Sequence, residues 1–436
     1  MKVSFFGAAQ EVGRSCIMVR SGNTTILLDA GIKLGEVEEH PTLPDALLKH
    51  IDAVFVTHAH LDHSGYLPHI FSAGYEGKVY ATKPTLELIN VLISDYMHIS
   101  NPQNVSTEGL ARMRKSYEIV EFGETVRIKD ISVTPMFAGH ILGSAMLYVS
   151  DGKHTLLYTG DINLSKTRLL DGADTKNLTA ETLITESTYG ARTDIMPAES
   201  TTAKKMLVDI KETLIRGNKV IIPSFAVGRA QEVLLLLDDF MNSGTLPKVP
   251  IYIDGMINKA MRIHRHNVIY CRKELQRKIL MSDTDPFKSS NFFPVETRQA
   301  RSKAASEDGA SIIVTTSGML TGGPIVYYLR RLAGNPSNKL ILVGYQANGT
   351  PGNALQSGAT TLRFEHATVA IKLEIRSYHL SAHVDRPHLE AMIRSVKTLK
   401  NVFIIHGEKN KAEELSSDIQ KNFRVIVPKL GEEYDV

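Results

Sequence analysis

The stretch His58-Ala59-His60-Leu61-Asp62-His63 decides how this chain is interpreted. It places three histidines and one carboxylate within six residues, directly after the apolar run at residues 53–56. Such a run predicts a buried strand, so the cluster lies on the loop that follows this strand. Imidazole nitrogens and a carboxylate oxygen are ligands that zinc prefers. A chance gathering in a His-rich tract is the alternative, but the chain has only 16 histidines in 436 residues. We therefore predict a metal site.

The composition is that of an ordinary globular protein. Hydrophobic residues make up 43% and charged residues 22%, which allows a large core. The net charge is only +3, so any surface for nucleic acid has to be a local patch. Cys16 and Cys271 show no metal-binding spacing, and no run of about 18 apolar residues occurs. We expect a cytoplasmic protein with no disulfide framework and no membrane partner.

The predicted elements divide the chain into three segments. Residues 1–194 predict mainly strands, and residues 195–367 alternate strands with helices. This alternation favours a mostly parallel sheet covered by helices. From residue 368 strands again precede histidines, at 369–375 and at 401–405. The middle segment is therefore predicted to be inserted into a domain that the two outer segments build together.

Short motifs at the ends of the predicted strands resemble a known family. His58-x-His60-x-Asp62-His63, Gly139-His140 and Gly160-Asp161 are similar to the ligand series of the metallo-β-lactamase fold. Glu186-Ser-Thr-Tyr, Ser381-Ala-His383 and His406-Gly-Glu408 resemble the β-CASP nucleases within that superfamily. Together with the segment PSFAVGRAQE at residues 223–232, they resemble archaeal and bacterial relatives of the endonuclease subunit of the cleavage and polyadenylation specificity factor.

The resemblance implies an α/β fold class, a metallo-β-lactamase αββα sandwich with an inserted β-CASP domain. Residues 1–194 would form the first part of the metallo-β-lactamase domain and residues 368–436 its C-terminal part. Residues 195–367 would form the β-CASP domain, a parallel sheet covered by helices.

The resemblance also implies two Zn²⁺ per chain, with Mn²⁺ as a possible substitute. One ion would be held by His58, His60 and His140. The second would be held by Asp62, His63 and His406, with Asp161 bridging both. Such a ligand set suits two ions roughly 3.5–4 Å apart, and a hydroxide bridging them would attack phosphorus in line.

The same resemblance also implies roles in catalysis or in support of the ligands. His383 would contact the scissile phosphate and is a candidate to protonate the leaving oxygen. Glu186 would orient His383, and a carboxylate beside an imidazole also raises its pKa. Asp62 and Asp161 would act in catalysis as well as in metal binding. Asp29 would support the His-rich loop from behind the ligands.

Taken one at a time, these residues have ordinary structural explanations. An Asp at a strand end, such as Asp29 or Asp161, commonly bonds the backbone of a turn. Glu186 alone would be an exposed carboxylate, and His383 or His406 a capping or core histidine. The ordered set favours function. The remaining histidines that we considered match no ligand motif, although His379 lies close to His383: His69, His98, His264, His266, His366, His379 and His388.

The inserted domain is expected to border a cleft for a single strand. Ser317-Gly318-Met319 follows a predicted strand and precedes a helix, where backbone N–H groups suit a phosphate oxygen. The middle of the inserted domain is locally basic. For most of these basic residues a solvated helix face is the ordinary explanation, but some of them could contact phosphates. Phe292-Phe293 could stack bases, but core packing is the simpler interpretation.

The implied function is a zinc-dependent endoribonuclease that hydrolyses single-stranded RNA and leaves 3′-hydroxyl and 5′-phosphate ends, in RNA 3′-end processing or decay. One alternative is a ribonuclease J-like 5′→3′ exoribonuclease, against which the Ser-Ala-His form of its motif argues. Another is a catalytically silent RNA-binding scaffold, which would lack ligands. A metallo-β-lactamase hydrolase for a thioester or lactam would not need the inserted domain.

The implied partners are single-stranded RNA, a second copy in a homodimer, and RNA-processing or decay proteins. The sequence begins at the first predicted strand, so we expect no RNA-binding KH modules. It continues only briefly after residue 428, so we also expect no partner-binding tail. Sequence preference would then have to come from the cleft or from other proteins.

Overall fold

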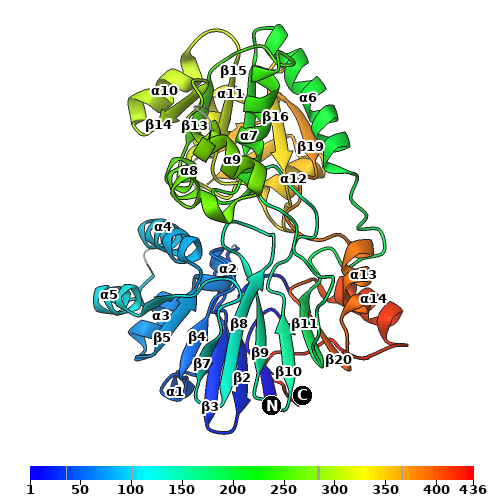
Figure 1. The fold of residues 1–436 in the computed structure, drawn as a ribbon. Coiled ribbons are helices and arrows are strands. Elements are labelled where there is room, and N and C mark those ends of the chain that lie inside the picture. Colours follow the sequence, from blue (N-terminus) through cyan, green and yellow to red (C-terminus); the bar gives the residue numbers. More distant parts are fainter. Residues whose placement is uncertain (36, 101, 282–284, 365–366) are drawn as a thin grey trace. The chain divides into compact units, whose positions relative to one another are not determined.

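The computed structural model describes residues 1–436 except 36, 101, 282–284 and 365–366. The chain forms two compact units, and each is described by itself. Unit 1 comprises Met1–Lys166, Asp171–Ile195 and His383–Val436. Unit 2 comprises Thr167–Leu170 and Met196–Ala382. Both ends of the chain therefore build unit 1, and the middle of the sequence forms unit 2 (Figure 1).

Unit 1 contains two seven-stranded sheets, each part parallel and part antiparallel. The first has the strand order β22-β1-β2-β3-β4-β5-β6, with parallel pairs from β3 to β6. Its strands are β1 (Lys2–Phe5), β2 (Ile17–Ser21), β3 (Thr24–Leu28), β4 (Ala53–Phe55), β5 (Lys78–Ala81), β6 (Tyr117–Ile119) and β22 (Glu433–Asp435).

The second sheet has the order β21-β20-β11-β10-β9-β8-β7, with parallel pairs from β21 to β10. Its strands are β7 (Val126–Ile128), β8 (Ile131–Phe137), β9 (Ala145–Ser150), β10 (Thr155–Tyr158), β11 (Thr182–Glu186), β20 (Asn401–Ile405) and β21 (Arg424–Ile426). Strand β11 thus pairs with β20, although more than two hundred residues separate Glu186 from Ile405 in the sequence. This pairing returns the C-terminal segment to the edge that carries the candidate ligands.

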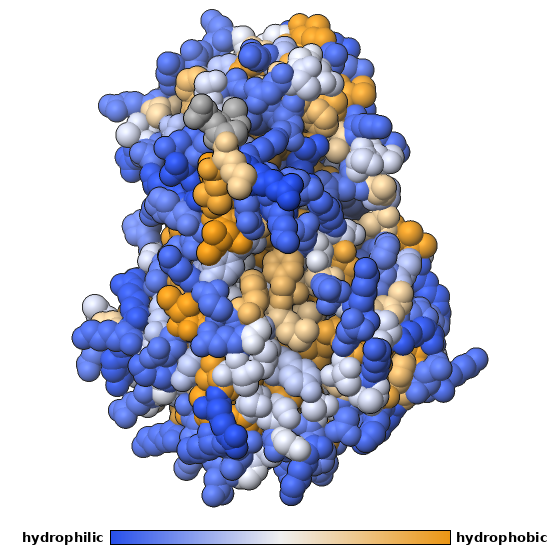
Figure 2. Space-filling view, in the orientation of Figure 1, coloured by the Kyte–Doolittle hydropathy of each residue, from blue (hydrophilic) through white to orange (hydrophobic). Residues whose placement is uncertain are grey.

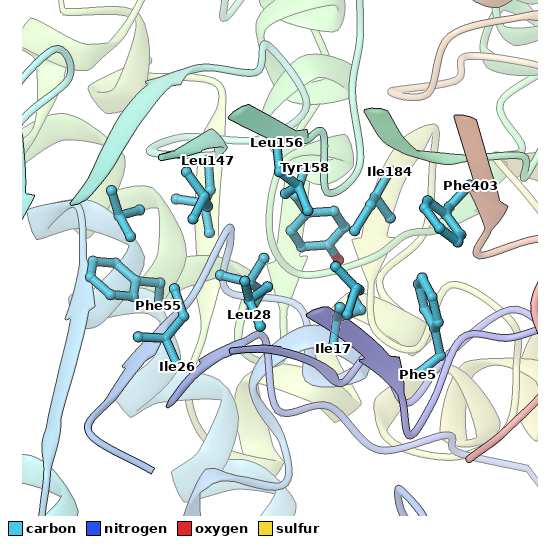
Figure 3. Close-up of a cluster of buried hydrophobic side chains, with 14 of the residues drawn as sticks. Phe5, Ile17, Ile26, Leu28, Phe55, Leu147, Leu156, Tyr158, Ile184 and Phe403 are labelled. Atoms are coloured by element: carbon cyan, nitrogen blue, oxygen red, sulfur yellow. The ribbon is translucent and has the colours of Figure 1, made fainter. Parts of the chain in front are cut away.

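The two sheets of unit 1 face each other across an apolar core (Figure 3). Side chains alternate between the faces of a strand, so every second residue of β3 and β10 points inward. Ile26 and Leu28 from the first sheet meet Leu156 and Tyr158 from the second in one buried cluster. Burying this apolar surface is the main force that holds the sandwich together.

Helices cover the outer faces of both sheets, which completes the αββα layers (Figure 1). Helices α13 and α14 pack on the second sheet, where Leu389 and Leu415 join a cluster with Leu183 and Ile404. The helices of unit 1 are α1 (Asp45–Leu48), α2 (Leu61–Ser64), α3 (Leu67–Ser72), α4 (Lys83–Ser100), α5 (Thr107–Lys115), α13 (Arg386–Ser395) and α14 (Lys409–Ile419).

Unit 2 is built on a six-stranded sheet of the order β14-β13-β15-β12-β16-β19, in which every pair is parallel. Its strands are β12 (Lys219–Pro223), β13 (Ile251–Asp254), β14 (Phe292–Val295), β15 (Ser311–Thr315), β16 (Lys339–Val343) and β19 (Glu374–Tyr378). A separate antiparallel pair consists of β17 (Thr361–Phe364) and β18 (Ala367–Ala370).

Helices pack on this parallel sheet as its buried strands require. Tyr328 and Leu329 of α11 join Ile221 and Ile313 of the sheet in the core of unit 2. The helices of unit 2 are α6 (Glu199–Ile215), α7 (Arg229–Asn242), α8 (Ile257–His266), α9 (Lys273–Met281), α10 (Arg298–Ser306), α11 (Pro324–Leu332) and α12 (Pro351–Gln356), with 3₁₀ turns η1 (Val268–Tyr270) and η2 (Pro286–Lys288).

Two predicted elements are divided in the structure. The strand expected at 369–375 is two strands, because the amides of Lys372 and Leu373 bond to the carbonyl of Ala333 instead of to a strand. β19 then pairs with β16, so residues 368–382, expected in the final segment, lie in unit 2. The sequence pattern at 257–270 predicts one helix, but α8 ends at His266, because Asn267 leaves the helical conformation and η1 follows.

Among the described residues, no helix has both the length and the apolar composition needed to cross a membrane. The face of the molecule shown in Figure 2 carries mostly hydrophilic residues, with apolar residues in small groups.

Candidate metal centre

The His-rich stretch forms a tight turn directly after the buried strand β4. His60 is the residue that precedes α2, so the last residues of the stretch lie in the first turn of a short helix. The Ser64 hydroxyl donates to the Ala59 carbonyl over 2.9 Å and closes this turn. Helical geometry from Leu61 onward then turns His63 inward, and both His58 and His63 are fully buried.

The other candidate ligands arrive at the ends of strands in the second sheet. His140 follows β8, Asp161 follows β10 and His406 follows β20. All three are buried, with exposed fractions of 4%, 2% and 2%. The structure brings these residues to the His-rich turn from distant segments: His406 Nε2 lies 3.2 Å from Asp62 Oδ2, although 344 positions separate the two residues in the sequence.

Three groups of side chains that could hold a cation share Asp161 among the described residues. His58, His60 and His140 form the first group with it, Asp62, His63 and His406 form the second, and Glu186 and His383 form the third. Within each group the potential ligand atoms all lie within 4.8 Å of one another.

The two oxygens of Asp161 face different groups. Oδ2 lies 3.6 Å from His58 Nε2 and 3.7 Å from His140 Nε2. Oδ1 lies 3.4 Å from His63 Nε2 and 3.2 Å from His406 Nδ1. A carboxylate placed in this way can join two neighbouring cations, one through each oxygen.

Burial and charge set the protonation of the cluster. Burial lowers the pKa of His58 and that of His60, so both imidazoles are neutral, which is the form that binds metal. Burial alone would raise the pKa of Asp161, but the imidazoles of His406 and His63 outweigh it and hold the pKa well below its usual range. The Asp161 carboxylate is therefore ionised, and a cation beside it would balance its negative charge.

Asp29 fixes the orientation of His63. Its Oδ2 lies 2.7 Å from His63 Nδ1 and accepts a 2.7 Å hydrogen bond from the Tyr158 hydroxyl. Its Oδ1 accepts from the Thr57 amide over 2.7 Å. With Nδ1 engaged in this way, the lone pair of His63 Nε2 is directed at the cluster, which is the usual role of a carboxylate behind a metal-binding histidine.

The backbone at the centre departs from ordinary geometry. Asp29 and His406 both have positive φ, 60° and 46°, a region that residues other than glycine adopt only at a cost. Gly160, at φ +53°, packs against Thr57, where an added Cβ would lie 2.8 Å from Thr57 Cβ. Glycine next to Asp161 therefore allows the β10 loop to approach the His-rich turn closely.

Glu186 and His383 form a pair beside Asp161. His383 Nδ1 lies 2.9 Å from Glu186 Oε2 and 3.9 Å from Asp161 Oδ2. The Ile162 amide donates to Glu186 Oε1 over 2.8 Å, which fixes the carboxylate. Burial lowers the pKa of His383, but the Glu186 and Asp161 carboxylates outweigh it and raise this pKa to about 9. His383 keeps an exposed fraction of 18%, so it can reach a substrate.

The donor set fits a divalent cation. Nε2 of His58 is buried and makes no hydrogen bond within the part of the chain that the structure describes. Leaving such an atom without a partner is costly unless a ligand binds it. Imidazoles and carboxylates converge in the numbers that zinc and manganese sites use.

The remaining predicted site residues lie elsewhere or have other roles. Ser317, Gly318 and Met319 follow β15 in unit 2, where an added Cβ on Gly318 would lie 2.8 Å from the Phe225 amide nitrogen. His264 is buried in α8 and bonds the Ala260 carbonyl. His366 lies outside the described residues.

Sequence analysis missed three residues of the centre. Thr57 contacts Asp29 through its hydroxyl and lies 3.1 Å from His58 Nδ1. Tyr158 donates to Asp29, and Thr188 Oγ1 lies 3.4 Å from His406 Nδ1. Each stands within three residues of a candidate ligand or of Glu186, which is the one signal the sequence offered.

Comparison with known proteins agrees with this arrangement. Residues 18–188 match the metallo-β-lactamase superfamily domain, residues 230–355 the β-CASP domain, and residues 368–428 the Zn-dependent metallo-hydrolase RNA specificity domain. The chain is 38% identical to the transcription termination factor FttA of Methanocaldococcus jannaschii over 441 residues, 97% of this chain and 69% of that protein.

The chain belongs to the β-CASP metallo-β-lactamase family. The expected fold class and family are therefore confirmed. Within the family, the FttA of Methanothermobacter thermautotrophicus is 36% identical over 443 residues, 97% of this chain and 70% of that protein. A protein of unknown function from Enterococcus faecalis shares the fold, with a TM-score of 0.62 at 14% identity over 99% of both chains. Membership in this family implies divalent metal binding, and the His/Asp cluster of unit 1 is suited to it.

Proposed function

We propose that this chain is a zinc-dependent endoribonuclease that hydrolyses phosphodiester bonds of single-stranded RNA and leaves 3′-hydroxyl and 5′-phosphate ends. The observation that carries the proposal is the position of Asp161 between two groups of ligands, with the Glu186–His383 pair beside it. Other hydrolases of the superfamily would need the metal groups but not this pair.

His58, His60 and His140 would hold one ion, Asp62, His63 and His406 the other, and Asp161 both. When bound, such ions lower the pKa of a water molecule and neutralise charge on the phosphoryl oxygens.

The Glu186–His383 pair would handle the leaving group. Glu186 holds His383 through Nδ1, so Nε2 is the nitrogen that would exchange a proton with the substrate. A carboxylate that fixes the tautomer of an imidazole also stabilises its protonated form. His383 would donate this proton to the leaving 3′ oxygen after the scissile phosphate is attacked.

The comparisons with known proteins support RNA as the proposed substrate. Two relatives are named as transcription termination factors, and the match over residues 368–428 is to a domain named for RNA specificity. A role in RNA 3′-end processing, decay or termination follows for this chain. Gly318 and Met319 are proposed to contact the substrate through backbone N–H groups, and Ser317, whose amide donates to the Gly322 carbonyl, through its hydroxyl. A homodimer is the proposed assembly.

The two alternatives differ in what they require. A 5′→3′ exoribonuclease needs a free 5′-monophosphate, and a silent RNA-binding scaffold needs no metal centre. Within the described residues all seven proposed ligands and the Glu186–His383 pair are present and close together, which favours an active enzyme.

Three RNAs of one sequence test the proposal: linear with a 5′-hydroxyl, linear with a 5′-monophosphate, and circular. Purified protein supplied with zinc or manganese should cut all three internally, and the circle should yield a full-length linear product. Cleavage only of the monophosphate RNA, with mononucleotide products, would show the exonuclease. Binding without cleavage under every metal condition would show the scaffold.

A further inference from the structure

A pocket in unit 2 has no part in the proposed chemistry. It has a volume of about 270 Å³ and lies between α8, η2 and the end of β14. Ligand pockets usually measure about 300–1,000 Å³, so this one is large enough for a single small group rather than for a long strand. All of its lining residues are in unit 2.

One face of α8 forms a wall of the pocket. Asn258, Met261, Arg262 and Arg265 recur at the spacing that places residues on one side of a helix. Asn258 and Met261 are buried, whereas Arg262 keeps an exposed fraction of 62%. The wall therefore changes from a mostly apolar interior to a cationic rim.

The floor of the pocket is apolar and partly aromatic. Ile253, Met261 and Phe287 are buried there, and Phe292 and Pro294 of the edge strand β14 complete it. Flat aromatic and aliphatic surfaces of this kind accept the face of a nucleobase.

Asn258 is the one polar group of the floor. Its Nδ2 donates to the Ile253 carbonyl over 2.8 Å, which fixes the orientation of the amide. Its Oδ1 accepts no hydrogen bond from any described residue, although the side chain is nine-tenths buried. The pocket therefore offers a hydrogen-bond acceptor whose natural partner is an N–H of a ligand.

The rim carries more positive than negative charge. Arg262 lies 3.4 Å from Glu296, and Arg265 is paired with Asp285. Lys288 is exposed and makes no ion pair with a described residue. Arg262 and Arg265 also keep donors beyond these contacts, because a guanidinium has five. The rim can therefore accept one phosphate.

We infer that this pocket binds one nucleotide, with the base against Phe287 and Phe292, an exocyclic amino group on Asn258 Oδ1, and the phosphate on Arg262 and Lys288. An amino group is present on adenine, cytosine and guanine. Uracil offers only its ring N3–H, whose two flanking carbonyls would face the Asn258 oxygen unfavourably, so we expect uridine to bind most weakly. The nucleotide is either free or part of a single strand. The strand case rests on the proposed function, in which the pocket would hold one nucleotide of the RNA substrate.

The test uses the full chain in EDTA, so that binding is measured without cleavage. The ligands are adenosine monophosphate, inorganic phosphate, and single-stranded RNAs of twelve adenosines or twelve uridines. The variant Arg262→Glu/Lys288→Glu reverses two exposed charges of the rim. The matched control, Lys204→Glu/Lys211→Glu, reverses two exposed charges on α6.

The rim variant should weaken binding of the adenosine RNA at least about fivefold and lower the slope of log K against log salt by about one to two. The control should retain wild-type affinity. Adenosine monophosphate distinguishes a free nucleotide from a nucleotide within a strand. If the rim variant binds adenosine monophosphate more weakly than the wild type does, the pocket binds a free nucleotide. If only RNA binding is weakened, the pocket binds one nucleotide of a strand. Equal losses in the rim and control variants would overturn the inference, as would phosphate competing as well as the nucleotide.

Asn258→Leu tests the contact to the base. It should bring the affinity for the adenosine RNA down to that for the uridine RNA, and its melting temperature shows whether unit 2 is still folded. Equal affinities of the wild type for both RNAs would overturn the contact even if Asn258→Leu fails to fold. With metal restored, the rim variant should keep kcat and raise KM. Absence of cleavage in the wild type would contradict the proposed function and leave the binding result standing.

Discussion

Asp161 follows strand β10 in unit 1, and Asp254 is the last residue of strand β13 in unit 2. Both carboxylates are buried, but the groups around them differ. Asp254 is fully buried and accepts from Arg301 over 2.7 and 2.8 Å, from the Tyr328 hydroxyl over 2.8 Å and from the Gly255 amide over 2.7 Å. Among the described residues, the ion-pair contacts of Asp161 are all to imidazoles, at 3.2–3.9 Å.

This difference separates a structural carboxylate from one arranged for a ligand. A buried charge is tolerated when it is paired and hydrogen-bonded, as at Asp254. The cluster around Asp161 contains no Lys or Arg ion pair among the described residues. It also contains strained backbone at Asp29 and His406. Such a centre is suited to cations, and we propose that two metal ions take this place.

The largest effect is expected at the bridging carboxylate. Asp161→Asn removes the charge shared by both groups, so the metal content should fall and the cleavage rate should drop at least about a thousandfold. Elemental analysis and cleavage of a labelled RNA measure the two quantities. As the control, Asp254→Asn should keep its metal; loss of metal in both variants would remove the contrast.

His383→Ala should separate catalysis from metal binding. The proposed ligands do not include His383, so the metal content should be unchanged while kcat falls by about 10² to 10⁴, the range of a general acid. Single-turnover cleavage and elemental analysis on one preparation provide the test. If the variant lost its metal, the assignment of His383 to the leaving group would be wrong.

Asp254→Ala should affect stability instead of chemistry. It leaves Arg301 and Tyr328 without their shared acceptor, and breaking a buried pair costs about 3–5 kcal/mol. Arg301 is 30% exposed, so solvent reduces the expected loss to about 2–4 kcal/mol. Hydrogen exchange of peptides from β13 and β15 measures it, and the peptide with the His-rich turn should be unchanged. An unaltered opening free energy in unit 2 would contradict the structural role.

A pH effect is expected at His264 in unit 2. Burial lowers its pKa from 6.5 to about 4, so below pH 6.5 the unfolded chain takes up the proton first. The stability of unit 2 should therefore fall as the pH drops from 6.5 to 4, by up to about 3 kcal/mol, and this contribution should level off below pH 4. Urea unfolding of the wild type and of His264→Phe measures it. Parallel pH profiles of the two proteins would contradict the effect.

The fold and the candidate ligands could be predicted because both depend on local patterns. Apolar runs predicted the strands, and each proposed ligand stands within a short motif directly after one of them, as His58 does after β4. The structure brings these motifs together in unit 1. The assignment of a ligand to one ion or the other stays a prediction.

What the sequence could not show depends on contacts between distant residues. Thr57 and Tyr158 are typical strand residues, and only the folded chain places both against Asp29. The pairing of β19 with β16 is likewise non-local, so residues 369–375 read as one strand although the backbone leaves the sheet between two. The orientation of the Asn258 side chain is also set by a tertiary contact, because its amide nitrogen donates to the Ile253 carbonyl.

The most direct test of the central claim is native mass spectrometry of the wild-type chain purified without chelators and supplied with zinc. We predict about two zinc ions per wild-type chain. Because Asp161 is shared by both groups of ligands, Asp161→Asn should lose at least one of them. A chain that binds no zinc or manganese, yet keeps its fold, would contradict the claim that the Asp161 carboxylate of unit 1 is arranged for metal.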